Sequence, residues 1–338
     1  MKLKKFAILF IIIQIIILSG CKDNSTSPTE SSNRMSVVGS YNTPDFAYDV
    51  SIMSISGLTY AFISDGTSGL QIVNVTNPAT PMFISNYNTA GTALAVFTAV
   101  INNSQYAFLS DGIQGLAIIN VSNPSSPVLD TAIYFPNDRV FTSFVDAQNA
   151  ILYVGTYYGN IYIFNISGLP NTVTQIASYT SPQDNITGIY VTNGIAYVSE
   201  RSLGIEIINV SNPSNPQNIS NYDTPGYSYD VVVGGNYAYV ADATSLYVIN
   251  VTNPFDPVYA GMSSVENATY LGVAISYPYQ IYTADYSYGV ETFGLGVPSS
   301  PAQVGFYNTD GFSNNLAYYN SNIFVADGSD GLIILKYQ

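Results

Sequence analysis

The chain has 338 residues, and it contains no histidine, no tryptophan and one cysteine. Because histidine is the commonest general base and metal ligand, its absence removes the usual route to acid–base catalysis. One cysteine excludes a disulfide framework, a cysteine-based zinc cluster and an iron–sulfur site within the chain. The composition therefore excludes many classes of enzyme before any motif is considered.

Charged residues are scarce as well. They make up 9% of the chain, against a usual share of about 25%. The balance is acidic, with 22 Asp and Glu against 8 Lys and Arg. Since a nucleic-acid partner requires a basic surface, we expect none. Hydrophobic residues make up 47% of the chain and 30 residues are tyrosine, so the composition is not that of a disordered protein.

Residues 1–20 have the parts of a secretory signal peptide. Three lysines within residues 1–5 precede an apolar run over 6–18 that only Gln14 interrupts. This run is shorter than the about 20 residues of a membrane-spanning helix. The tetrad Leu-Ser-Gly-Cys that ends at Cys21 resembles the lipobox of bacterial lipoproteins. The resemblance implies that Cys21 is lipidated, for example with palmitate, and becomes the first residue of the mature protein. The alternative is an uncleaved anchor helix followed by an incidental cysteine.

Residues 21–35 are rich in Ser, Thr and Asn, and their composition predicts a flexible tether behind the lipid. Acyl chains, buried at ~0.8 kcal/mol per CH₂, would hold the protein on a membrane. By resemblance to Gram-negative sorting rules, Lys22 is not the aspartate that retains lipoproteins at the inner membrane. We therefore expect an exported protein, anchored by lipid to the cell envelope at the outer membrane or cell surface.

Residues 36–338 consist of one motif repeated seven times. A marker residue, acidic in six copies, recurs at intervals of 42–46 residues. An aromatic residue stands three positions before every marker, which fixes the register of the copies. The markers are Asp65, Asp111, Thr156, Glu200, Asp242, Asp285 and Asp327.

Each copy predicts four β-strands. Alternation with period 2 and β-branched residues indicate strands, and Asp-Gly-x-x-Gly and Asn-Pro-x-x-Pro indicate the turns between them. Four strands per copy are typical of a β-propeller blade. The seventh copy lacks its fourth strand, and segment 36–43 resembles such a strand without its blade. We predict an all-β, seven-bladed propeller closed by this N-terminal strand; the alternative is an open β-solenoid.

The repeat resembles the LVIVD-repeat family over residues 36–338. The motif strand is Leu-Ala-Ile-Ile-Asn at 116–120, and the Asn-Pro-x-x-Pro turn and the period agree with it. The family occurs in bacterial and archaeal cell-surface and secreted proteins, so the resemblance implies a propeller outside the cell. Because the family has no established common activity, it implies a scaffold and no particular reaction. One departure is systematic, since five copies end the motif strand with asparagine where the family has aspartate: Asn74, Asn120, Asn165, Asn209 and Asn250.

The acidic markers are predicted to lie on one face of the ring, because loops that leave the second strand and enter the first share that face. We interpret them as structural residues, each capping its own turn, since the following glycine suits a turn with positive φ. The alternative is a functional ring of carboxylates. The set comprises Asp65, Asp111, Glu200, Asp242, Asp285 and Asp327.

A second ring is predicted on the innermost strands, at the mouth of the central channel. Counting about twelve residues back from each marker gives Asp49, Thr98, Ser143, Gly188, Asp230, Gly272 and Asn315. Carboxylate and amide oxygens suit a hard cation, so Ca²⁺ at the channel mouth is one expectation. Tyrosines beside such groups suit a sugar or a peptide. The predicted ligand-binding residues are Asp49, Asp230, Asn315, Tyr48, Tyr229 and Arg139, with Tyr227 on the same face. The alternative is a channel that holds only water.

No catalytic constellation is found in the sequence. A Ser–His pair, a phosphate-binding glycine loop and zinc-ligand spacing are all absent. We favour a non-catalytic propeller that binds an extracellular protein or glycan. Two alternatives stay open: an enzyme acting on extracellular polysaccharide through carboxylates of the same face, and a purely structural component of the envelope.

The charge pattern of the repeats suggests an acidic habitat. Residues 36–338 contain 20 acidic and 3 basic residues, so almost no carboxylate can find a salt-bridge partner. Repulsion among carboxylates opposes folding at neutral pH and is relieved in acid. A compositional bias toward Asn, Tyr, Ile and Ser in the lineage explains the pattern equally well.

Overall fold

The computed structural model describes residues 34–181, 185–264, 269, 271–276, 278 and 280–338. The predicted signal peptide, Cys21 and most of the predicted tether lie outside these residues. Every regular element in the described part is a β-strand, and a search of that part for membrane-spanning helices found none.

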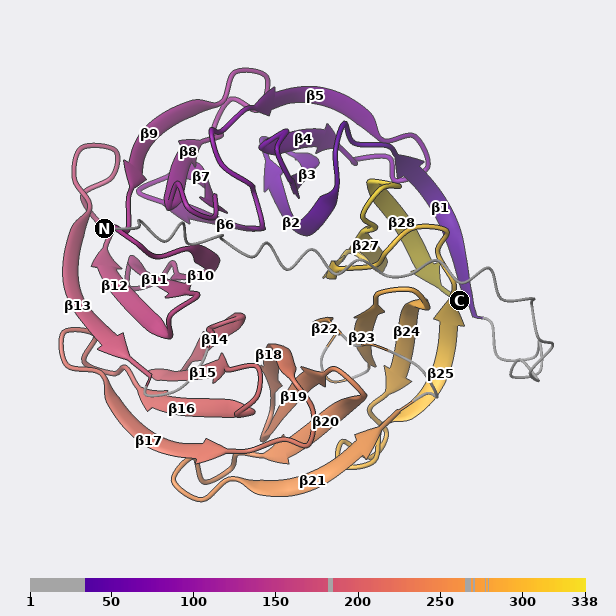
Figure 1. Ribbon diagram of the computed structural model, residues 1–338. Helices are drawn as coiled ribbons and strands as arrows, with labels where there is room; N and C mark the ends of the chain where they lie inside the picture. The colour runs from indigo at the N-terminus through magenta and orange to yellow at the C-terminus, as the bar shows by residue number, and fades with distance from the viewer. Residues whose placement is uncertain (1–33, 182–184, 265–268, 270, 277, 279) are drawn as a thin grey trace, which may run out of the picture. The chain divides into compact units, whose positions relative to one another are not determined.

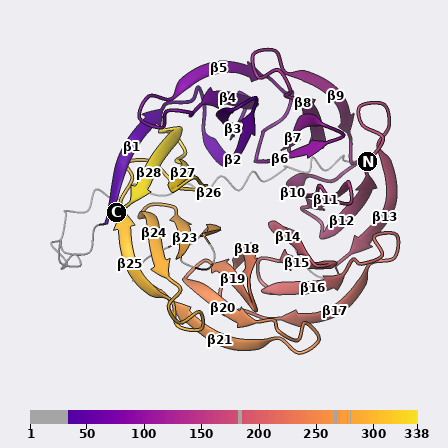
Figure 2. The ribbon, with the colours of Figure 1, turned by 180° about the vertical axis from the view of Figure 1, so that it is seen from behind.

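The 28 strands form seven antiparallel sheets of four strands, arranged as blades around a channel (Figures 1 and 2). The prediction of an all-β, seven-bladed propeller is confirmed. Along each of the first six blades the strands run outward in chain order: β2 (Ala47–Ile55), β3 (Leu58–Asp65), β4 (Leu70–Asn74) and β5 (Met82–Tyr87); β6 (Ala95–Ile101), β7 (Ser104–Ser110), β8 (Leu116–Asn120) and β9 (Val128–Ile133); β10 (Val140–Asp146), β11 (Ile151–Thr156), β12 (Asn160–Asn165) and β13 (Thr174–Thr180); β14 (Gly188–Thr192), β15 (Ile195–Ser199), β16 (Ile205–Asn209) and β17 (Gln217–Tyr222); β18 (Ser228–Gly234), β19 (Tyr237–Asp242), β20 (Ser245–Asn250) and β21 (Val258–Ser263); β22 (Gly272–Ser276), β23 (Gln280–Asp285), β24 (Gly289–Gly294) and β25 (Ala302–Tyr307).

The seventh blade contains both ends of the repeat region. Its strands β26 (Asn315–Tyr319), β27 (Asn322–Ala326) and β28 (Leu332–Tyr337) are completed by β1 (Met35–Tyr41), which pairs antiparallel with β28. The two strands lie side by side at the edge of the ring in Figure 1. Closure of the ring by the N-terminal strand is therefore confirmed, with the strand starting one residue earlier than the segment picked out in the sequence.

The Asp-Gly-x-x-Gly segments form tight turns between the second and third strands of a blade. In the first blade the N–H of Ser68 donates to the carbonyl of Asp65 at 2.8 Å, and Gly69 has a φ of 71°. A Cβ on Gly69 would lie 2.4 Å from the carbonyl oxygen of Tyr87. Glycine is required here because both the backbone angle and the space exclude a side chain.

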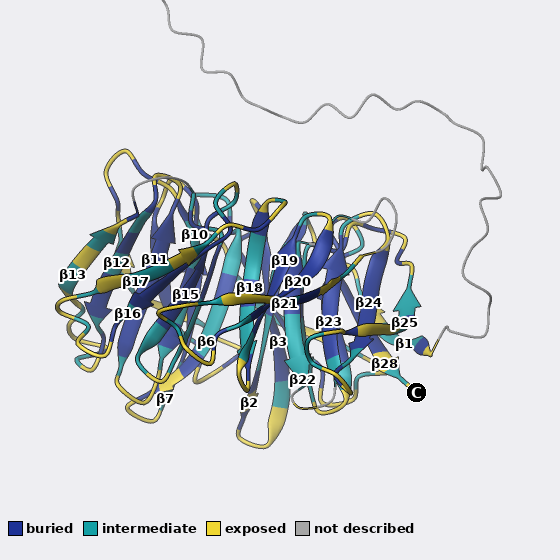
Figure 3. Cartoon of the chain, turned by 90° about the horizontal axis from the view of Figure 1, so that it is seen from below, coloured by how far each residue is buried: buried dark blue, intermediate teal, exposed yellow. Residues whose placement is uncertain are grey.

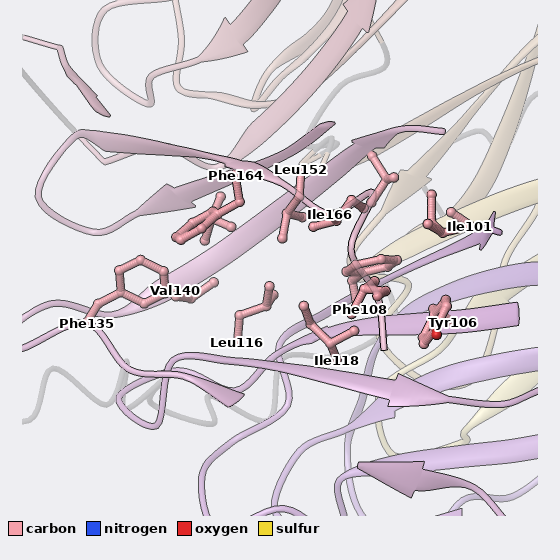
Figure 4. Close-up of a cluster of buried hydrophobic side chains, with 14 residues drawn as sticks. Ile101, Tyr106, Phe108, Leu116, Ile118, Phe135, Val140, Leu152, Phe164 and Ile166 are labelled. Carbon is pink, nitrogen blue, oxygen red and sulfur yellow. The ribbon is translucent and has the colours of Figure 1, made fainter. Parts of the chain in front are cut away.

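The core lies between neighbouring blades. In one cluster, Phe108 and Leu116 of the second blade pack against Leu152 and Phe164 of the third (Figure 4). The aromatic residues three positions before the markers are all at most 5% exposed: Phe62, Phe108, Tyr153, Tyr197, Tyr239, Tyr282 and Phe324. In Figure 3 the exposed residues gather on loops and on outermost strands. The blades are thus joined by apolar side chains, and the loops on either face carry the polar groups.

Candidate functional site

The acidic markers lie beneath the loops that enter the innermost strands. All six are at most 3% exposed. Asp327 shows the pattern most fully: its carboxylate accepts hydrogen bonds from Thr309 Oγ1 at 2.7 Å, from Ser313 Oγ at 2.8 Å and from the N–H of Gly311 at 3.2 Å. These partners belong to the connection between blades, 14–18 residues upstream, and not to the marker's own turn.

The same arrangement recurs around the ring. Asp111 accepts bonds from Thr89 and Gly91, and Asp242 accepts bonds from Thr224 and Gly226. The prediction that each carboxylate caps its own turn is therefore wrong in this detail, because the backbone of the turn satisfies itself. The carboxylates of these markers bond instead to the connection from the preceding blade.

Burial raises the pKa of five markers above the ordinary value, and that of Asp285 to about 6: the five are Asp65, Asp111, Asp242, Asp285 and Asp327. Desolvation is the larger cause, and the hydrogen bonds to each carboxylate offset part of it. Buried and bonded to backbone, these groups present no ring of carboxylates to a ligand.

A cavity of about 330 Å³ occupies the mouth of the central channel on the face of these loops. It is lined by the first residues of innermost strands together with residues from the adjoining loops and turns. Five of the six predicted ligand-binding residues line it: Tyr48, Asp49, Tyr229, Asp230 and Asn315. Arg139 does not line it. Its guanidinium carbon lies 6.0 Å from the ring centroid of Tyr157, which does not line the cavity either.

The ring of channel-mouth positions is correct in five blades and shifted in two. In each blade the mouth residue pairs with the residue just before the marker, as Asp49 does with Ser64. The equivalents in the second and third blades are Ala95, paired with Ser110, and Thr142, paired with Gly155. Thr98 and Ser143 lie deeper along their strands. The error arises because the hairpin between the first two strands differs in length among blades, so no fixed count finds this position.

Asp49 and Asp230 each join two innermost strands. The carboxylate of Asp49 accepts bonds from the N–H of Val50 at 2.8 Å and of Val96, in the next blade, at 2.9 Å. Asp230 does the same with Val231 at 2.8 Å and Val273 at 3.1 Å. Innermost strands of different blades share no sheet ladder, so these side chains supply bonds that the backbone lacks.

The mouth positions that are glycine make room for these side chains. A Cβ on Gly188 would lie 2.9 Å from Oδ1 of Asp230, and one on Gly272 would lie 2.4 Å from Oδ1 of Asn315. Asn315 in turn hydrogen-bonds Asp49 in the next blade. Where one blade carries a polar mouth residue and its neighbour a glycine, the polar side chain leans over the glycine.

Desolvation raises the pKa of Asp49 to about 6 and that of Asp230 to about 7, and hydrogen bonds from backbone N–H groups offset part of the rise. The charge of Asp49 contributes further to the raised pKa of Asp230. Near neutral pH these two carboxyl groups therefore titrate between a neutral form, which can donate a hydrogen bond, and an anion. The cavity that they line is also lined by aromatic residues.

Arg201 also lines the cavity, although it was not among the predicted ligand-binding residues. Its guanidinium carbon lies 5.6 Å from the ring centroid of Tyr227 and 5.8 Å from that of Tyr229. The sequence does contain a signal for it, because Arg201 follows a marker at a position where three other copies have glycine: Gly66, Gly112 and Gly328.

Aromatic rings from neighbouring blades meet beside Tyr48. Its ring lies 4.9 Å from that of Phe46, which in turn lies 6.2 Å from Phe312, and Phe312 stacks on Tyr286 at 4.7 Å. Tyr48 thus belongs to an array of rings that extends from the cavity along the face. Such an array offers apolar faces to a flat or ring-shaped ligand.

No metal site is found in the described part of the chain, where no group of three or more His, Cys, Asp or Glu could hold an ion. The oxygens of Asp49 and Asp230 already accept backbone N–H groups. Calcium at the channel mouth therefore stays a prediction. The chemistry that the cavity itself offers is hydrogen bonding, ring stacking and one cation.

The model of the LVIVD repeat matches residues 49–89, 100–133, 186–224 and 225–263, together less than half of the chain. No curated protein matches the chain. Among solved structures, the crystal structure of the RRP9 WD40 repeats has a TM-score of 0.71 at 9% identity, covering 90% of this chain and 98% of that one. The structure of U3-55K has a TM-score of 0.69 at 9% identity, with the same coverage. At this identity the likeness concerns the fold alone. The chain is thus a seven-bladed β-propeller that contains LVIVD repeats in four of its segments.

Proposed function

We propose that the protein is a lipid-anchored envelope protein whose propeller binds an extracellular glycan in the channel-mouth cavity, without catalysing a reaction. The cavity supports this proposal most directly, because it is lined by two tyrosines together with polar residues: Tyr48 and Tyr229, with Asp49, Asp230 and Asn315. A sugar ring has an apolar face and polar edges, so rings beside directional hydrogen-bonding groups match both. A volume of about 330 Å³ suits one or two sugar rings better than a protein surface.

The ligand is tested by titrating the full-length protein with neutral and acidic oligosaccharides in a calorimeter. Tyr48→Ala should lower the affinity for the oligosaccharide about tenfold, because a stacking surface is lost. Tyr134→Ala is the matched control, since Tyr134 is 64% exposed and does not line the cavity. Tyr48→Phe retains the ring and should bind nearly as wild type.

Three outcomes contradict the proposal. If no oligosaccharide binds, or if Tyr48→Ala and Tyr134→Ala weaken binding equally, the cavity is not a glycan site. If a bound oligosaccharide is cleaved, the protein is an enzyme. Thermal unfolding of each variant, followed by circular dichroism, separates loss of a contact from loss of the fold.

The anchor is proposed from the sequence around Cys21, and it is tested in cells. Wild-type protein should incorporate a labelled fatty acid and fractionate with the membrane. Cys21→Ala should abolish incorporation and release the protein to the soluble fraction. Equal labelling of the two forms, or membrane retention of the variant, would favour an uncleaved anchor helix instead.

A further inference from the structure

Arg201 is held in a backbone conformation that its side chain does not favour. Its φ is 28°, in the left-handed region. At the equivalent positions, Gly66, Gly112 and Gly328 have φ values of 51° to 57°, and Ala243 and Tyr286 have positive φ values of 44° and 24°. A residue other than glycine in this region is strained, and such strain concentrates at functional sites. Glycine, alanine and tyrosine all occur at this turn in other blades, so the turn does not require an arginine.

Within the described part of the chain, the guanidinium is positioned by aromatic rings and makes one weak hydrogen bond. In the described part of the chain its hydrogen-bond partner is Oδ1 of Asn185 at 3.5 Å, and no ion pair to a carboxylate of that part is found. An arginine has five N–H donors, and described residues accept from one of them. Cation–π contacts with Tyr227 and Tyr229 hold the group in place.

The charge at this place is unusual for this molecule. Residues 36–338 contain 20 acidic and 3 basic residues, and of the basic ones only Arg201 lines the channel-mouth cavity. A bidentate arginine is the residue that best matches the geometry of a carboxylate. The N–H donors of a guanidinium lie in its plane, so an arginine held by cation–π contacts can still donate from its edge.

We propose that Arg201 binds the carboxylate of an acidic saccharide, a hexuronate unit, whose ring contacts the aromatic side chains of the cavity. This inference rests on the proposed glycan-binding function and specifies its ligand class. Tyr48, Tyr229 and Thr142 also line the cavity, and hydroxyl groups of these residue types suit hydrogen bonds to the hydroxyls of a sugar.

The cavity also makes this recognition depend on pH. Its titratable lining residues are Tyr48, Asp49, Arg201, Tyr229 and Asp230. Ionised Asp49 and Asp230 repel an anionic ligand, and their raised pKa values, about 6 and about 7, make both neutral in mild acid. A hexuronate with an ordinary carboxyl pKa of about 4 stays ionised at pH 5. Affinity for it should therefore rise several-fold from pH 8 to pH 5.

The experiment compares trigalacturonate with its methyl ester, which has the same shape without the charge. Both are titrated into full-length protein at pH 5.5. Wild type should bind the acid about 10- to 100-fold more tightly than the ester, because a charge-assisted hydrogen bond contributes about that much to affinity. Arg201→Gln should abolish that preference, while Arg139→Gln, the matched loss of a tyrosine-stacked arginine outside the cavity, should retain it.

Arg201→Gly guards against a structural explanation. Because glycine suits the turn, this variant should melt within about 3 °C of wild type and still lose the preference. If wild type binds acid and ester equally, the inference is overturned while glycan binding stands. The same holds if Arg139→Gln loses the preference for the acid as fully as Arg201→Gln does. Failure of both probes to bind would instead count against the glycan function and this inference together.

Discussion

The propeller uses carboxyl groups in two ways on one face. The marker aspartates recur from blade to blade, lie buried, and fasten the incoming connection, as Asp327 does through Thr309, Gly311 and Ser313. At the channel mouth, by contrast, the equivalent positions differ from blade to blade, and only Asp49 and Asp230 are acidic. These two also hold backbone groups, but they border a cavity that has room for a ligand.

The difference separates architecture from function within a repeat protein. A residue that every blade needs is copied with the blade, so repetition indicates a structural role. A residue that breaks the repeat serves something that is not repeated. Arg201 is the clearest case, because it is the one cation among the residues that follow the markers and it lines the cavity.

The largest expected effect is a loss of stability with rising pH. Both the marker aspartates and the channel-mouth aspartates contribute to it. The folded-state pKa values of Asp49, Asp230 and Asp285 are raised, to about 6 or 7, above the ordinary value of 3.8. Between these limits the folded state binds more protons than the unfolded state. The free energy of unfolding should therefore fall as pH rises from 4 to 8, by a total on the order of 10 kcal/mol.

Urea unfolding followed by circular dichroism measures this dependence, since the chain has no tryptophan for fluorescence. The double variant Asp49→Asn/Asp230→Asn should remove more than half of this decrease in the free energy of unfolding. The part that remains then measures the contribution of the markers. A free energy of unfolding that rises between pH 4 and pH 8 would refute the charge assignment and the acid-habitat hypothesis with it.

Removal of one marker tests the structural half of the comparison. Asp327→Ala leaves the donors of Thr309, Gly311 and Ser313 without their acceptor, and should cost about 3 to 4 kcal/mol in unfolding free energy. Asp256→Ala removes an exposed aspartate and should change it by less than about 0.5 kcal/mol. Similar losses in the two variants would mean that the markers do not fasten the blades.

A smaller effect is expected from a methyl group at the mouth. In Gly272→Ala the new Cβ meets Asn315, whose Oδ1 would be 2.4 Å away, so overpacking should cost about 2 kcal/mol. Gly296→Ala is the control, because nothing lies within 4 Å of a Cβ there. Equal melting temperatures for the two variants would show that the side chains at the mouth are free to move, contrary to their bonding.

Most of the fold could be predicted from the sequence. The period, the turn chemistry and the missing fourth strand fix blade number and closure, because these follow from local patterns and chain connectivity. The partners of the marker carboxylates could not be predicted. Thr309 lies in the connection that enters the seventh blade, and only the folding of that connection over the blade brings it to Asp327.

The candidate site was predictable in part. Asp49, Asp230 and Asn315 follow from blade geometry. Thr98 and Ser143 were predicted at positions that Ala95 and Thr142 hold, because hairpin length varies among blades. Arg201 could not be predicted because its position beside the cavity depends on contacts with tyrosines of the next blade. A search for residues that replace glycine after the marker finds it, together with Tyr157, Ala243 and Tyr286.

The central claim is that the channel-mouth cavity is a binding site built from residues that break the repeat. The affinity ratio between trigalacturonate and its methyl ester, measured for wild type and Arg201→Gly, tests it most directly. The account predicts a ratio of about 10 or more for wild type and near 1 for the variant, with similar melting temperatures. A ratio near 1 for wild type, or one that the variant leaves unchanged, would contradict it.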